Sequence, residues 1–256
     1  MTASDNSLLK DIYVSVVFLT RFPAPGWPDA AARPLANGMW AFPLAGILVA
    51  TVGGAVYLLC DLLELPVMIA ALFATVSMIV VTGGLHEDGL ADLADGVWGG
   101  SDRESRLAIM SDSRIGAYGA IALIVSVAGR AAAIAVIGDT ALVLGALVTA
   151  CAASRAMMPL VMAFGSAAKS DGLGAGAGTP TGAAWGGALL LSFFIVLVAA
   201  PADWLGCLVA AVLGAALIGW FAQRTLGGYT GDVLGASQQA AELFALSVIA
   251  GAVMGS

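Results

Sequence analysis

Three aspartates at helical spacing are the feature of this sequence that most suggests chemistry. Asp88, Asp92 and Asp95 stand at positions i, i+4 and i+7 of "TGGLHEDGLADLADGVWGG", residues 82–100. At about 100° per residue they would share one helix face within an arc of about 60°. Carboxylates gathered there repel each other unless a cation neutralises them, and oxygen ligands suit Mg²⁺, Mn²⁺ or Ca²⁺. The spacing favours a metal site, with a solvated acidic helix end as the alternative.

Arginines that could bind phosphate follow this cluster. "SDRESRLAIMSDSRIGAYG" supplies Asp112 and Arg114 just before an apolar run, where Arg114 would lie near a helix N-terminus. Arg130 and Arg155 stand inside apolar runs. An arginine within a membrane costs at least ~2.5 kcal/mol, so it needs an interior partner or a polar cavity. The two buried arginines would therefore either reach a substrate cavity or pair with a buried acid or carbonyl.

Two further polar positions are candidates for the same site. Asp232 lies in a glycine-rich polar insert, "LGGYTGDVLGASQQAAEL", and a plain turn would explain this pattern equally well. Glu242 then enters the last apolar run, where an unpaired acid is costly. His86 is the only histidine and could act as a catalyst or as a hydrogen-bonded helix cap.

The elements that position these residues are predicted to be membrane helices. The chain has 256 residues, of which 60% are hydrophobic and 11% charged, whereas soluble domains are about 25% charged. We predict an all-α polytopic membrane helix bundle that forms a single domain over residues 1–256. Stretches of about 20 apolar residues predict seven spans, at about 38–60, 66–85, 116–138, 140–164, 183–200, 203–222 and 239–255.

Two segments outside the spans complete this organisation. Residues 1–37 are predicted to be a cytoplasmic or interfacial segment, in which the apolar spacing of Leu8, Ile12 and Val16 suggests an amphipathic helix. We expect no cleavable signal peptide, because charged residues precede any long apolar run. Residues 86–115 are predicted to form a cytoplasmic acidic-motif segment, and 165–182 a flexible loop.

Charge placement predicts the orientation of the bundle. Every lysine and arginine of the loops falls on one side, and the opposite loops carry only the acids Asp61, Glu64, Asp139 and Asp203. By the positive-inside rule the basic side is cytoplasmic, which puts the N-terminus inside, the C-terminus outside and the acidic cluster toward the cytoplasm. No basic run suggests nucleic acid as a partner.

Several motifs together resemble a known family. "FLTRFPAP", "GGLHEDGLADLADG", "IMSDSRIGAYG" and "GGYTGDVLGA" occur in the order of the cobalamin synthase family of adenosylcobinamide-GDP ribazoletransferases. The resemblance implies a multi-pass enzyme of the bacterial inner membrane that joins α-ribazole, or its 5′-phosphate, to adenosylcobinamide-GDP and releases GMP. It also implies a divalent cation, usually Mg²⁺.

The family pattern differs from this chain at two positions. Family members often carry an acid where this chain has Gln239, while Glu242 matches a second acid of the pattern. A leucine is usual where this chain has Glu87, and we expect that extra acid to face solvent.

The resemblance and the residue types together suggest roles. Asp88, Asp92 and Asp95 would bind one or two Mg²⁺ ions, and Asp95, Asp92 or His86 would take the proton of the attacking hydroxyl. The diphosphate would be held by Arg114, Arg130 and Arg155. Asp112 and Asp232 would complete the metal shell or orient these arginines.

Two other functions are weighed against this one. A membrane alcohol phosphotransferase with another acceptor would carry D-x2-DG-x2-AR, whereas this chain reads "EDGLADLAD". A cation transporter would more often place its acids in the middle of a span. We expect the lipid bilayer to be a partner in each case. The sequence allows a homo-oligomer as well as a monomer.

Overall fold

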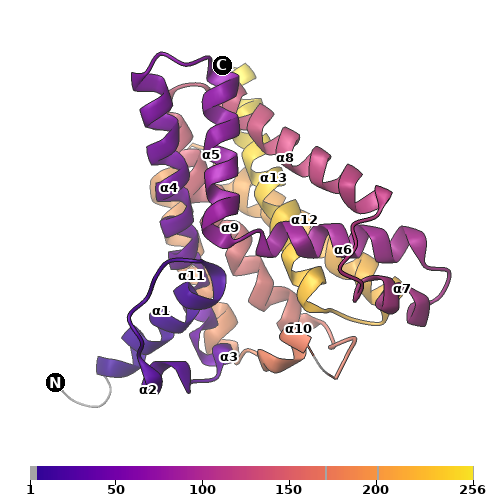
Figure 1. The fold of residues 1–256 in the computed structure, drawn as a ribbon. Coiled ribbons are helices and arrows are strands. Elements are labelled where there is room, and N and C mark those ends of the chain that lie inside the picture. The colour runs from indigo at the N-terminus through magenta and orange to yellow at the C-terminus, as the bar shows by residue number, and fades with distance from the viewer. Residues whose placement is uncertain (1–4, 171, 201, 256) are drawn as a thin grey trace.

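The protein is a bundle of long helices, seen in a computed structural model that describes residues 5–170, 172–200 and 202–255 (Figure 1). Residues 1–4 of the predicted N-terminal segment lie outside the described residues. The long helices are α4 (Phe42–Leu62), α5 (Val67–Thr82), α6 (Leu85–Gly99), α8 (Ala117–Ile137), α9 (Thr140–Phe164), α11 (Gly182–Ala199), α12 (Trp204–Leu226) and α13 (Gly231–Gly255). Shorter helical elements are α1 (Asp5–Leu19), α2 (Pro28–Ala31), α3 (Leu35–Gly38), η1 (Met39–Ala41), α7 (Arg103–Ile109) and α10 (Gly172–Gly176).

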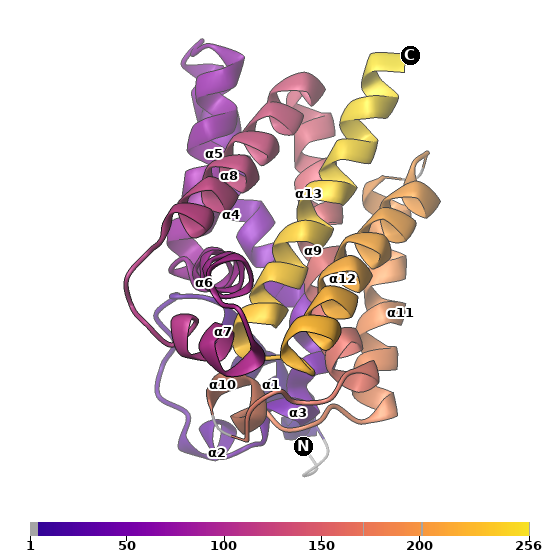
Figure 2. The ribbon, with the colours of Figure 1, turned by 90° about the vertical axis from the view of Figure 1, so that its right-hand side faces the viewer.

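The prediction of an all-α membrane bundle is confirmed. Among the described residues, 6 helices are long and apolar enough to cross a membrane, or 7 when α5 and α6 count as one bent pair. α5 supplies the apolar part of the predicted second span. α6 turns away from it by 91° and lies below α5 and α8 in both views (Figures 1 and 2). The acidic motif therefore occupies a helix of its own, which is turned away from α5.

The last helix is longer than predicted. α13 begins at Gly231, so the polar insert before the predicted span at 239–255 is mostly helical rather than a glycine turn. Its polar side chains are buried, including Gln238, Gln239 and Glu242. These residues find partners on neighbouring helices, which a sequence pattern does not reveal. Similarly, the predicted loop at 165–182 contains the short helix α10.

α9 and α13 form the centre of the bundle. In each, 72% of the most apolar stretch is buried, against 22% in α11, which lies at the edge. α9 packs against α4, α11 and α13, and α12 packs against α13 (Figure 2). Small residues allow this packing, since a Cβ atom on Gly214 of α12 would lie only 2.8 Å from the backbone of Ala240 on α13.

The N-terminal helix α1 turns its polar residues toward the protein. Asp11 accepts hydrogen bonds from Arg33 Nε at 2.7 Å and from Trp40 Nε1 at 3.2 Å, and Ser15 donates to the Gly38 carbonyl at 2.7 Å. Leu8 and Leu9 point outward and are 56% and 52% exposed. This arrangement suits a helix lying on a membrane surface, and that placement stays a prediction.

Candidate functional site

A double-glycine elbow sets the direction of α6. Gly83 and Gly84 both adopt left-handed backbone angles, with φ of 66° and 70°, which glycine reaches without the steric cost of a Cβ atom. The Arg21 amide donates to the Val81 carbonyl at 2.7 Å and so fastens the chain after α1 to this elbow. The "FLTRFP" and "TGGLHEDG" motifs, far apart in sequence, therefore meet in the fold.

α6 crosses α13 with their backbones in contact. A Cβ atom on Gly89 would lie 2.8 Å from Cα of Asp232, and one on Gly235 would lie 3.2 Å from Cα of His86. Each helix thus places a glycine against a candidate site residue of the other. The crossing brings the predicted Asp232 beside the acidic face of α6.

The three aspartates of α6 have different surroundings. Asp95 is buried, and its two oxygens accept hydrogen bonds from the amides of Gly116 at 2.7 Å and Gly119 at 2.9 Å. These amides belong to the N-terminus of α8, whose free N–H groups need acceptors, so Asp95 caps that helix. Asp88 is exposed and Asp92 half-buried. The predicted roles of Asp95 as metal ligand and base stay predictions, with both of its oxygens already engaged.

Asp92 has an unusual charge environment. Burial, followed by the charges of Asp88, Asp232 and Asp95, raises its pKa from 3.8 to about 7. Asp88, Asp92 and Asp232 therefore act on one another electrostatically, as carboxylates sharing one site do.

The donor set at the crossing fits a hard cation in its chemistry. It consists of carboxylates together with the hydroxyl of Thr230, which donates to Asp232 Oδ2 at 3.1 Å. In the part of the chain that the structure describes, no three His, Cys, Asp or Glu side chains are already grouped closely enough to hold a metal ion. Ligation by Asp88, Asp92 and Asp232 would therefore require their side chains to converge.

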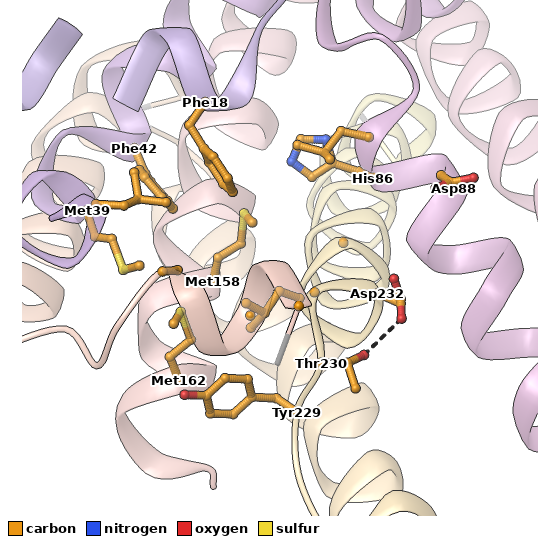
Figure 3. Close-up of a pocket in the computed structure, with 18 of the residues that line it drawn as sticks. Phe18, Met39, Phe42, His86, Asp88, Met158, Met162, Tyr229, Thr230 and Asp232 are labelled. Atoms are coloured by element: carbon orange, nitrogen blue, oxygen red, sulfur yellow. Dashed lines mark hydrogen bonds between the residues drawn. The ribbon is translucent and has the colours of Figure 1, made fainter. Parts of the chain in front are cut away.

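A cavity of about 180 Å³ lies next to this crossing, between α1, α4, α9, α13 and the chain around α10. Figure 3 shows its two sides, with Phe18, Phe42 and the methionines opposite Asp88, Thr230 and Asp232. Lys169 is the only lysine or arginine among the described residues that line it.

His86 stands at the boundary between these two sides. Its imidazole is 1% exposed, lines the cavity, and has an Nε2 atom without a hydrogen-bond partner. Burial, followed by the positive charge of Arg155, lowers the pKa of His86 to about 3, so the ring is neutral. A buried polar atom without a partner is costly, and His86 belongs to the lining of a cavity that a ligand could enter.

Behind His86 lies a buried network of four charges. Arg130 contacts Glu87 at 2.9 Å and Glu242 at 3.1 Å, and Arg155 contacts Glu242 at 3.4 Å. The positive charges of the two arginines and the negative charges of the two glutamates cancel, which offsets the cost of burying them. The network joins α6, α8, α9 and α13. The expectation that Glu87 faces solvent was wrong, because Arg130 draws this side chain into the bundle, where it is only 7% exposed.

Two of the three predicted phosphate-binding arginines meet in this network, but none of the three lines the cavity. Neither Arg130 nor Arg155 lines the cavity, and both are held by acids. Arg114 lies in the loop between α7 and α8, pairs with Asp112 at 2.6 Å, and has an 87% exposed side chain. Arg114 lowers the pKa of Asp112 by hydrogen bonding. Phosphate binding by these three arginines stays a prediction.

The site can be set beside known proteins. A model of the family described as cobalamin-5-phosphate synthase matches residues 11–250. The chain belongs to this family. It is 40% identical to an adenosylcobinamide-GDP ribazoletransferase of Bradyrhizobium diazoefficiens, over 99% of this chain and 98% of that one.

Two further relatives carry the same name. An adenosylcobinamide-GDP ribazoletransferase of Mesorhizobium japonicum is 40% identical over 97% of this chain and 95% of its own length. An adenosylcobinamide-GDP ribazoletransferase of Rhizobium johnstonii is 42% identical over 93% of this chain and 95% of its own length. No solved structure matches this chain with significant similarity.

Sequence reasoning missed the apolar half of the cavity. Phe18 belongs to the "FLTRFPAP" motif, which could have drawn attention to it, but its role depends on meeting Phe42, Met158 and Met162. These residues come from three helices, α1, α4 and α9, and each alone resembles an ordinary packing residue.

Proposed function

We propose that this protein joins α-ribazole or its 5′-phosphate to adenosylcobinamide-GDP, with release of GMP. The observation that carries this proposal is the family match over nearly the whole chain, combined with a cavity that gathers His86, Asp88 and Asp232. In the reaction, a ribose hydroxyl forms a bond to the phosphorus attached to the cobinamide. The bond from that phosphorus to the oxygen of GMP breaks.

His86 is proposed to contact the attacking hydroxyl. It is the one predicted catalytic residue that lines the cavity, since neither Asp92 nor Asp95 does. We propose that Nε2 accepts a hydrogen bond from this hydroxyl and orients it, while the proton passes to the departing GMP phosphate. The pKa of about 3 makes this nitrogen a weak base, so its contribution is positioning, which together with charge neutralisation supplies most of the rate enhancement of phosphoryl transfer.

Asp88, Asp92 and Asp232 are proposed to hold one or two Mg²⁺ ions. When bound, Mg²⁺ would neutralise the charge of the diphosphate. The contact of Gly89 with Asp232 supports this assignment, because it lets ligands from two helices approach one point. Asp95 is proposed to position α8 against α6 rather than to bind the ion.

The buried charge network is proposed to hold His86 in place. Glu87 is adjacent to His86 and paired with Arg130, while Glu242 ties Arg155 to the same cluster. We further propose that the site faces the cytoplasm of a bacterial inner membrane, in accord with the charge distribution of the loops.

GMP release tests this function. Purified protein in lipid vesicles would receive adenosylcobinamide-GDP and α-ribazole, each alone and together, with Mg²⁺ or with EDTA. The proposal predicts GMP only when both substrates and Mg²⁺ are present. Release that does not need α-ribazole would indicate a hydrolase, and no release from folded protein would return the transporter interpretation to consideration.

A further inference from the structure

The cavity beside His86 has a wall that suits a flat apolar ring. The Phe18 and Phe42 rings stack almost in parallel, with centroids 6.3 Å apart and planes inclined by 13°. Met39, Met158 and Met162 complete this wall (Figure 3). Thioethers adapt to irregular shapes and make favourable contacts with aromatic rings. These side chains offer no strong hydrogen-bonding group.

The opposite side of the cavity is polar. Asp88, Thr230 and Asp232 line it, and His86, whose Nε2 atom has no hydrogen-bond partner, lies where the two sides meet. A ligand that fills this space must therefore be apolar at one end and rich in hydroxyl groups at the other. A nucleoside with an apolar base has this character.

Size and polarity select between the two substrates of the proposed reaction. Pockets for drug-sized ligands measure about 300–1,000 Å³, so a cavity of about 180 Å³ is too small for a corrin. Guanine would leave several polar edge atoms unpaired against phenylalanine and methionine, which is costly. The dimethylbenzimidazole base of α-ribazole carries two methyl groups and one unsubstituted ring nitrogen, and so loses far less on burial.

We propose that this cavity is the α-ribazole subsite, with the aromatic base against Phe18, Phe42 and Met158 and the ribose at His86 and Asp88. The assignment rests on the proposed function and specifies where one of its substrates binds. It leaves the diphosphate of adenosylcobinamide-GDP at the acidic face of α6, where Asp88 borders the cavity.

Met158→Ala tests the subsite, with Met157→Ala as the matched control. Both side chains are buried in α9, but Met157 belongs to the apolar core and does not line the cavity. Removing a contact from an apolar pocket weakens binding by about tenfold or more. Met158→Ala should raise the Kd of α-ribazole, measured calorimetrically without the second substrate, and its KM by this factor. The KM of adenosylcobinamide-GDP should not change, and Met157→Ala should leave both KM values unchanged.

A ligand series provides a second test that needs no variant. The native protein should bind α-ribazole more tightly than the riboside of unmethylated benzimidazole, and guanosine least. Equal binding of guanosine, or an unchanged KM for α-ribazole in Met158→Ala, would overturn the subsite while GMP release still supports the function. Conversely, if α-ribazole binds to the native protein and Met158→Ala weakens this binding, the subsite is supported even when no GMP is released.

Discussion

Gln239 Nε2 donates a hydrogen bond to Glu87 Oε1 at 3.1 Å, which joins the two positions that the motif resemblance singles out. The same Glu87 oxygen pairs with Arg130 at 2.9 Å. Glu242 supplies one acid of this network from α13, and Glu87 supplies the other from α6. We infer that Glu87 compensates for the lack of an acid at position 239, because its carboxylate contacts Gln239 and balances the charge of the buried network.

A double-mutant cycle at these two positions would test the compensation. Glu87→Leu leaves two buried arginines with one glutamate, and breaking a buried pair costs about 3–5 kcal/mol. Gln239→Glu alone adds a buried negative charge beside Glu87 and should also destabilise. The double variant should recover most of the loss, as measured by thermal unfolding in detergent. Additive losses in the double variant would show that the two sites do not compensate.

Asp95 should contribute to stability through the cap of α8. Asp95→Ala removes the acceptor for the Gly116 and Gly119 amides, and losing a cap costs about 0.5–2 kcal/mol. Asp139→Ala removes the cap of α9, where Asp139 accepts from the Leu142 amide at 2.9 Å, and serves as the control. Both variants should melt earlier, and the Mg²⁺ concentration for half-maximal GMP release should stay native in both. A large shift of that concentration in Asp95→Ala alone would make Asp95 a metal ligand.

The raised pKa of Asp92 predicts how stability depends on pH. In the folded protein Asp92 keeps its proton up to about pH 7, whereas the unfolded chain loses it near its ordinary value of 3.8. The contribution of the Asp92 proton to the free energy of unfolding is therefore lost as the pH rises from 3.8 to about 7. In EDTA, Asp92→Asn should melt at a higher temperature than the native protein at about pH 8 and at the same temperature below about pH 4. Mg²⁺ should stabilise the native protein more than the variant.

An opposite result at Asp92 would be informative. If Asp92→Asn melted earlier than the native protein at about pH 8 in EDTA, the carboxylate would be stabilised rather than repelled by its surroundings. Asp112→Asn is the control, because the pKa of Asp112 is shifted in the opposite direction: hydrogen bonds from Arg114 lower it. This variant should not gain stability at any pH.

The contact between α6 and α13 should not tolerate a methyl group. A Cβ atom on Gly89 would lie 2.8 Å from backbone atoms of Asp232, so Gly89→Ala must push the helices apart. We expect loss of GMP release by at least tenfold, since small misplacements of reacting groups are costly. Gly186→Ala is the control, because a Cβ atom there meets nothing within 4 Å. Full activity of Gly89→Ala would mean that the spacing of the two helices is unimportant.

The sequence predicts much of the fold because lipid imposes simple rules. Long apolar runs identified the spanning helices, and the spacing of the aspartates predicted that they lie on one helix, which is α6. Asp95 could not be distinguished from Asp88 by spacing, because its role depends on a loop that brings Gly116 beside it. The partners of Arg130 and Arg155 depend on how four helices meet, and Glu87 appeared exposed for the same reason.

The direct test of the central claim is GMP release by Asp88→Asn, compared with Asp29→Asn, in protein shown to be folded. Asp29 is 79% exposed in its side chain and lies in α2, away from the crossing of α6 and α13. With both substrates and saturating Mg²⁺, we predict a loss of at least a hundredfold for Asp88→Asn and native activity for Asp29→Asn. Native activity in Asp88→Asn would contradict a reaction at this crossing.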